Sequence, residues 1–212
     1  MKDIVQQFFT AGERLEIERH IRAAETRSSG QIVVMAVSSS SRYPDAVLAG
    51  SGTLAMLLSL PATIATGSEN MWLFLLIFAT LFIVMHEVMK RTLFLKRLFV
   101  SRREMKGEVE EAAFKAFFQR RVHETTNHTG ILLYISLFEH SVRVLADSGI
   151  DAKVGSPKWQ EIVDMITAGI VERRPAEAIC SAVDRCAEIL QHHFPSQTDD
   201  RNELADAMII GQ

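Results

Sequence analysis

"GILLYISLFEHSVRVLA", residues 130–146, holds the two strand patterns around which the rest of the chain can be arranged. Residues 130–137 form a near-continuous apolar run, residues 140–146 alternate between polar and apolar, and the intervening FEH suits a hairpin turn. A strand that is apolar throughout is typical of a sheet covered on both faces. The pattern therefore predicts an α/β domain built on this hairpin.

Helical patterns lie on both sides of the hairpin. Apolar residues recur at helical spacing in 108–125, 156–170 and 179–190. Thr10 and Glu13 have capping-box spacing and begin another helix, which leads to the β-branched strand pattern QIVVMAV at residues 31–37. The order of elements predicts a three-layer α/β/α sandwich with a short mixed sheet.

The domain organisation follows from the first strand, which has no partner nearby. Residues 31–37 need the strand at 130–137 to complete a sheet, so residues 1–41 and 107–195 are expected to form one domain. Residues 42–106 then form an insertion, and residues 196–212 are expected to be a flexible tail.

The insertion is predicted to be a transmembrane helical hairpin. No residue between Asp45 and Glu69 is charged, and ten Leu, Ile, Phe or Val side chains lie between Leu73 and Val84. The first stretch is long enough at about 1.5 Å per residue to cross the roughly 30 Å of a hydrocarbon layer. The second ends its uncharged run at Met85 and is slightly short, so residues up to Met89 should complete the span. The five residues TGSEN join the two stretches, so the helices should be antiparallel, with Trp72 at the membrane interface. The alternative is a buried hairpin in a soluble core.

Basic residues set the expected orientation. The segment after the second span is rich in cations, whereas the connecting loop carries only Glu69, which predicts two spans in the inner (plasma) membrane with both termini cytoplasmic. Apolar residues 93–94 and 98–99 interleave with these cations, as in a helix lying on an anionic membrane; a plain solvated helix is the alternative. The expected membrane-interface residues are Trp72, Lys90, Arg91, Lys96, Arg97, Arg102 and Arg103.

The composition of the chain bears on its class of partner and on the state of its cysteines. A formal net charge of −3 gives no basic field for nucleic acid, so we expect none as a partner. Cys180 and Cys186 are six residues apart in a helical pattern and fall on different faces, which favours two reduced thiols that fill the core.

A specific family is suggested by residues 130–163, "GILLYISLFEHSVRVLADSGIDAKVGSPKWQEIV", and 178–195, "AICSAVDRCAEILQHHFP". Together with "RNELADAMI" they resemble the TPM domain, in the bacterial branch described as predicted membrane proteins. The resemblance covers residues 8–38 and 108–210, and that branch's transmembrane insertion falls where residues 46–89 lie.

The resemblance implies two chemistries, because some TPM relatives are described as acid phosphatases and some bind calcium through surface acids. Asp147 and Asp151 in "ADSGID" match the family's position after the third strand, and Glu139 is a conceivable third ligand. The stretch "TNHTG" is neutral where many members carry an acid. We therefore expect no cofactor and at most weak binding of Ca²⁺ or Mg²⁺, with Asp147 as a turn residue in the competing structural interpretation.

The function expected from these features is a non-enzymatic one. The sequence has no recognisable active-site motif, and the predicted hairpin would anchor the domain to a membrane. These features predict a cytoplasmic module that binds the lipid bilayer and a membrane or cytoplasmic protein. The alternative is a metal-assisted phosphatase or other hydrolase at the membrane surface, which would need Asp147, Asp151 and Glu139 around one ion.

Overall fold

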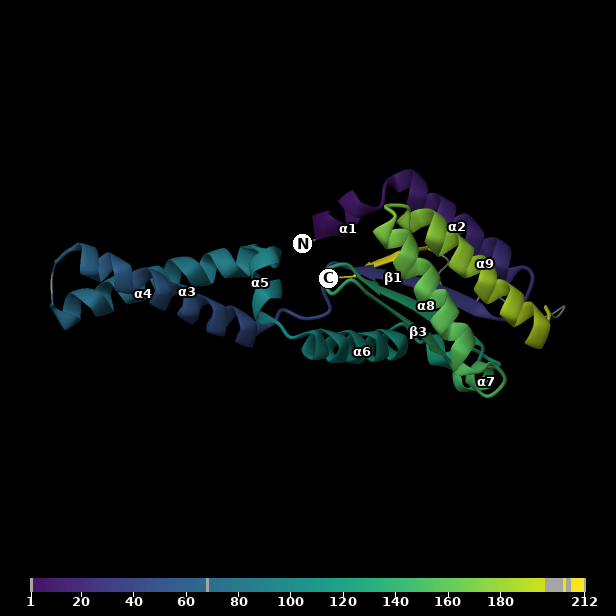
Figure 1. Ribbon diagram of the computed structural model, residues 1–212. Helices are drawn as coiled ribbons and strands as arrows, with labels where there is room; N and C mark the ends of the chain where they lie inside the picture. Colours follow the sequence, from purple (N-terminus) through teal and green to yellow (C-terminus); the bar gives the residue numbers. More distant parts are fainter. Residues whose placement is uncertain (1, 68, 197–203, 205–206, 212) are drawn as a thin grey trace. The chain divides into compact units, whose positions relative to one another are not determined.

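The computed structural model describes residues 2–67, 69–196, 204 and 207–211, and divides into two compact units. One unit joins Met1–Ser40 to Lys106–Gln212, and the other is Ser41–Met105 (Figure 1). The first unit contains a four-stranded sheet, and the second contains two long apolar helices.

The sheet of the first unit is mixed, with strand order β3-β2-β1-β4. β1 (Gln31–Val37) pairs in parallel with β2 (Gly130–Ser136), and β2 pairs antiparallel with β3 (Ser141–Ala146). The three strands lie at the predicted positions, and the mixed α/β class is confirmed. β4 (Ile209–Gly211) adds a parallel edge strand beside β1. The prediction of a flexible tail is therefore wrong for these three residues, whose backbone is fixed by sheet hydrogen bonds.

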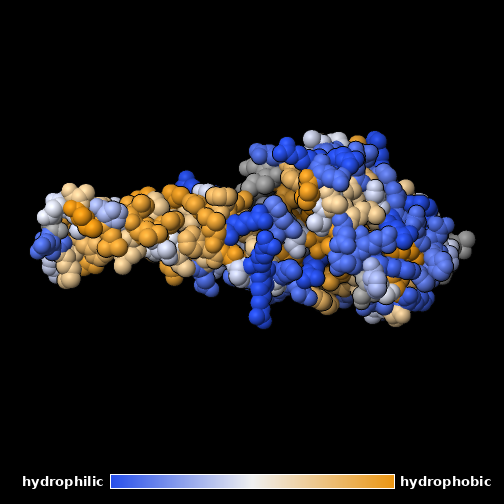
Figure 2. Space-filling model, in the orientation of Figure 1, coloured by the Kyte–Doolittle hydropathy of each residue, from blue (hydrophilic) through white to orange (hydrophobic). Residues whose placement is uncertain are grey.

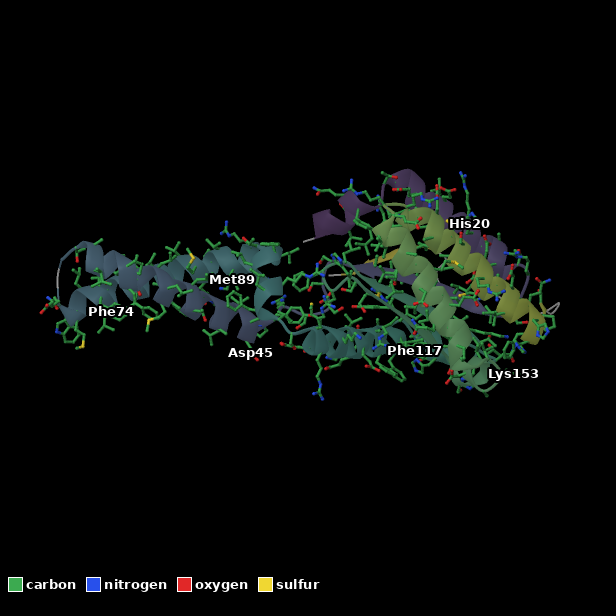
Figure 3. All side chains as sticks on the ribbon, in the orientation of Figure 1. His20, Asp45, Phe74, Met89, Phe117 and Lys153 are labelled. Atoms are coloured by element: carbon green, nitrogen blue, oxygen red, sulfur yellow. The ribbon has the colours of Figure 1, made fainter. Side chains whose placement is uncertain are left out.

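Helices cover both faces of this sheet. α2 (Ala11–Glu25), α8 (Ser156–Val171) and α9 (Pro175–His193) lie on one face, where they enclose Ile32, Val34 and the alternate residues of β2 (Figure 1). α6 (Arg102–Gln119) covers the other face, where Phe117 joins Val33 and Leu132 in a second core (Figure 3 labels Phe117). Alternate residues of two parallel strands thus enter two separate cores, as the continuous apolar runs predict.

Local signals explain where several helices begin. Thr10 and Glu13 form the predicted capping box at the start of α2, with the Thr10 Oγ1 accepting from the Glu13 backbone N–H at 3.2 Å. Pro157 and Pro175 occupy first-turn positions of α8 and α9. The shorter helices are α1 (Lys2–Phe8), the 3₁₀ turn η1 (Val122–Glu124) and α7 (Ser148–Asp151).

The second unit is an antiparallel helical hairpin with a short third helix. α3 (Pro44–Ala65) packs against α4 (Met71–Arg91), and α5 (Leu93–Phe99) packs against both. Small residues form the buried side of α3, and a Cβ on Gly50 would lie 2.4 Å from the Met89 Cε, so glycine permits the close helix approach there (Figure 3 labels Met89). α3 and α4 are long and apolar enough to cross a membrane.

Candidate functional site

Asp147 is the N-cap of the short helix α7. Its carboxylate accepts hydrogen bonds from the Ser148 backbone N–H at 2.6 Å and from the Nδ1 of His128 at 3.1 Å, with His128 Nδ1 as the donor. The side chain is buried, and Gly149 beside it allows α7 to approach the backbone of His128, since a Cβ there would lie 2.6 Å from the His128 carbonyl oxygen. Asp147 therefore fixes a turn by accepting from one free N–H group at the start of α7.

Asp151 ends the same helix and is exposed. Its backbone N–H donates to the Asp147 carbonyl oxygen at 3.0 Å, which places the two acids one helical turn apart. Only Asp147 is held in place by side-chain and backbone donors, whereas the Asp151 carboxylate faces solvent. The arrangement matches the turn interpretation of "ADSGID", and weak cation binding by this pair stays a prediction.

Glu139 lies at the other end of the β2–β3 hairpin. The six-residue strand β3 separates it from Asp147, a distance of about 20 Å at roughly 3.3 Å per residue. The structure therefore does not bring the three predicted metal ligands together. Among the described residues, no group of three or more His, Cys, Asp or Glu side chains could hold a metal ion.

Glu139 instead belongs to a buried polar cluster at the carboxyl ends of β1 and β2. Its carboxylate accepts hydrogen bonds from the Ser39 Oγ at 3.1 Å, the Ser40 backbone N–H at 2.9 Å and the Ser136 Oγ. Three donors on one buried carboxylate form a strong, charge-assisted set that ties the end of β1 to the hairpin. We call these four residues the Glu139 clasp.

Tyr134 borders the Glu139 clasp, with its hydroxyl 3.3 Å from the Ser40 Oγ. Burial raises the pKa of Tyr134, the negative charge of Glu139 raises it further, and the hydrogen bond with Ser40 partly offsets both effects. The phenol therefore stays protonated at neutral pH and can donate a hydrogen bond. Ser38 is also buried, and its hydroxyl has no hydrogen-bond partner among the described residues.

Ser39 and Ser40 of the Glu139 clasp are not among the site residues predicted from the sequence. The signal that could have identified them is their place directly after a parallel strand, because ligands in open α/β sheets bind outside the carboxyl ends of such strands. The cluster can orient hydroxyl and carboxylate groups, but the observed contacts are internal ones that join β1 to β2.

Burial in this fold disfavours the thiolate form of both cysteines. Burial raises the pKa of Cys180 to about 11, with further contributions from Glu16 and Asp184, and burial alone raises that of Cys186 to about 12. Both thiols stay protonated at neutral pH, and the thiolate is the reactive form. Both are reduced and buried, in line with their interpretation as core residues.

The expected membrane-interface residues all lie in the helical hairpin unit. Trp72 is 73% exposed in the first turn of α4, next to the loop between α3 and α4. Lys90, Arg91, Arg97, Arg102 and Arg103 are exposed in the segment after the apolar part of α4. Lys96 differs from these cations because it is buried.

The chain is similar to known proteins in part of its sequence and in its fold. Residues 95–189 match the TPM domain. The match agrees with the resemblance predicted from the sequence over these residues. The first unit, which contains most of them, is called the TPM domain below. The NMR structure of BA42 protein from the psychrophilic bacterium Bizionia argentinensis is similar in fold, with a TM-score of 0.60 and 18% identity over 96% of each chain. No curated protein matches the chain.

Proposed function

We propose that this chain is a membrane-anchored TPM-domain protein, in which α3 and α4 span the inner membrane and the TPM domain serves as a non-enzymatic binding module in the cytoplasm. The observation that carries the proposal is the exposure of α4. None of its most apolar eighteen-residue stretch is buried, although the helix consists mostly of apolar residues (Figure 2). Such a surface is expected to face lipid.

The dimensions of the hairpin support a full crossing. Helices of 22 and 21 residues are about 33 Å and about 32 Å long at 1.5 Å per residue, which matches a hydrocarbon core of about 30 Å. The alternative of a buried core hairpin predicts that the apolar side chains of α4 contact protein, yet Leu76 and Ile83 are 65% and 68% exposed. Lipid is the solvent that accommodates these side chains.

The position of the charges supports the orientation. Glu69 is the only charged residue in the loop between the helices, whereas Lys90 and Arg91 end α4 and further cations follow it. Positive residues are retained on the cytoplasmic side, so both ends of the hairpin, and with them the TPM domain, face the cytoplasm.

The contacts of the acids support a binding role over the metal-assisted hydrolase. Such a hydrolase needs several carboxylates around one ion with an open coordination position. Here the Asp147 carboxylate caps α7, and the Glu139 carboxylate lies at the opposite end of β3. A cytoplasmic or membrane protein is the expected partner of the module.

The test of the proposal is a topology map of the full chain in a bacterial inner membrane. Periplasmic reporters fused at Glu69 should be active, and the same reporters after Ser196 should be inactive. The chain should stay in the membrane pellet after alkaline extraction, whereas Phe78→Arg, which places a charge in mid-span, should release part of it because that insertion costs about 3 kcal/mol. An active periplasmic reporter after Ser196 with an inactive one at Glu69 contradicts the orientation, and full release of the wild-type chain contradicts the anchor.

A further inference from the structure

The helix α5 is a separate element at the base of the hairpin. α4 ends at Thr92, whose extended backbone (φ −104°, ψ 102°) interrupts the helix before α5 begins. α5 then packs against α3 and α4, and its Phe99 ring lies so close to Gly50 that a Cβ there would be 2.9 Å from the ring. The position of α5 is therefore set by contacts with both long helices.

The outer side of α5 is apolar and exposed. Phe94 and Leu98 are one helical turn apart and are 73% and 66% exposed. Arg97 precedes Leu98 and is exposed as well. Two large apolar side chains next to a cation, immediately after a span, are typical of a helix that lies in the boundary between headgroups and acyl chains.

α5 also carries a lysine without a carboxylate partner among the described residues. Lys96 is 7% exposed, and no carboxylate of the described residues lies within ion-pair distance of its ammonium group. Burial lowers the pKa of Lys96, because the ammonium form loses part of its hydration. A partly desolvated cation is unfavourable unless an anion supplies the missing interactions.

We propose that Lys96 binds the phosphate of an anionic phospholipid, with Phe94 and Leu98 inserted among the neighbouring acyl chains. The inference rests on the proposed membrane anchor. A lipid is favoured as the occupant because Phe94 and Leu98 are exposed apolar side chains, and because α5 begins two residues after Arg91, where the proposed span reaches the headgroups. The phosphate provides the negative charge that no carboxylate of the described residues supplies beside Lys96.

The experiment measures which lipids remain bound to the full chain. The protein is reconstituted in vesicles of equal parts phosphatidylcholine and phosphatidylglycerol, purified in mild detergent, and its retained lipids are counted by native mass spectrometry. The wild type should be enriched in phosphatidylglycerol. Lys96→Gln should lower this enrichment about fivefold, since one cation near an anionic surface contributes about 1 kcal/mol, and Lys96→Arg should retain most of it.

Lys90→Gln is the matched control, because it removes the same charge from an exposed site near the end of α4. Equal losses in Lys90→Gln and Lys96→Gln would show diffuse charge attraction and overturn the inference, as would displacement of the lipid by inorganic phosphate alone. Far-ultraviolet circular dichroism establishes that each variant is folded. A chain that stays in vesicles without enrichment in phosphatidylglycerol overturns this inference and leaves the anchor intact, whereas a chain that never enters vesicles refutes both.

Discussion

At the scale of single residues, substitution of Asp147 and Asp151 tests whether Asp147 has a structural role. As the N-cap of α7 it should stabilise the fold, so Asp147→Ala should lower the free energy of unfolding by about 1 kcal/mol. Asp151→Ala, at the exposed end of the same helix, should change it by less than about 0.5 kcal/mol. Chemical denaturation of both variants measures the difference, and equal effects would contradict the capping role.

Calcium binding by the same two acids can be tested directly through its effect on stability. Tight binding would raise the stability by about 2.7 kcal/mol at a hundredfold excess over the dissociation constant. We expect little or no rise in melting temperature with Ca²⁺ or Mg²⁺, because Asp147 and Asp151 leave most of the six to eight oxygen positions of Ca²⁺ to water. A clear rise that Asp147→Asn or Asp151→Asn abolishes would move the metal-dependent hydrolase ahead of the binding module.

The ionisation of Tyr134 at alkaline pH should lower the stability of the TPM domain. Its pKa is higher in the folded state than in the unfolded state, so the unfolded chain releases this proton first as pH rises. The contribution is complete below a pH of about 10, the ordinary pKa of tyrosine, and is lost as pH rises through the folded value. Tyr134→Phe should flatten this part of the stability profile. Tyrosinate absorbance provides the check, because Tyr43 is then the only tyrosine left.

At the scale of elements, the contact between α3 and α4 depends on Gly50. Gly50→Ala should destabilise the hairpin by about 1 to 3 kcal/mol, because the new methyl group would overlap Met89 and Phe99. Gly52→Ala is the control, since its Cβ would meet only the Phe82 ring, at 4.0 Å. Thermal unfolding of the full chain in detergent compares the two. A loss at Gly52 as large as at Gly50 would argue against this packing.

Elements with strong local signals could be predicted, and those that depend on distant partners could not. β1 and β2 are near-continuous apolar runs, and the cap at Thr10 marks α2, so these elements could be assigned from their own sequence. β4 has only three residues, and its pairing with Met35–Val37 is visible only in the folded sheet. The Glu139 clasp was missed for the same reason, since Ser39 and Glu139 are 100 residues apart.

At the scale of the whole molecule, the hairpin is expected to be dispensable for the folding of the TPM domain. Replacing residues 42–106 with a flexible linker should leave a soluble protein that unfolds cooperatively, because β1 needs β2 and both lie outside the replaced segment. Differential scanning calorimetry and gel filtration measure this. A linker variant that stays unfolded, while residues 108–195 fold alone, would show that the segments on either side of the hairpin are separate domains.

The pairing of β1 with β2 also has a consequence for the order of events during synthesis. The chain leaves the ribosome from its N-terminus, so β1 emerges long before Gly130, with both apolar helices of the hairpin in between. An apolar strand without its neighbour is prone to aggregate. On the proposed topology, the hairpin already holds the nascent chain at the bilayer before β2 has been synthesised. The translocation machinery and chaperones at the membrane therefore have to protect β1 until it can pair with β2.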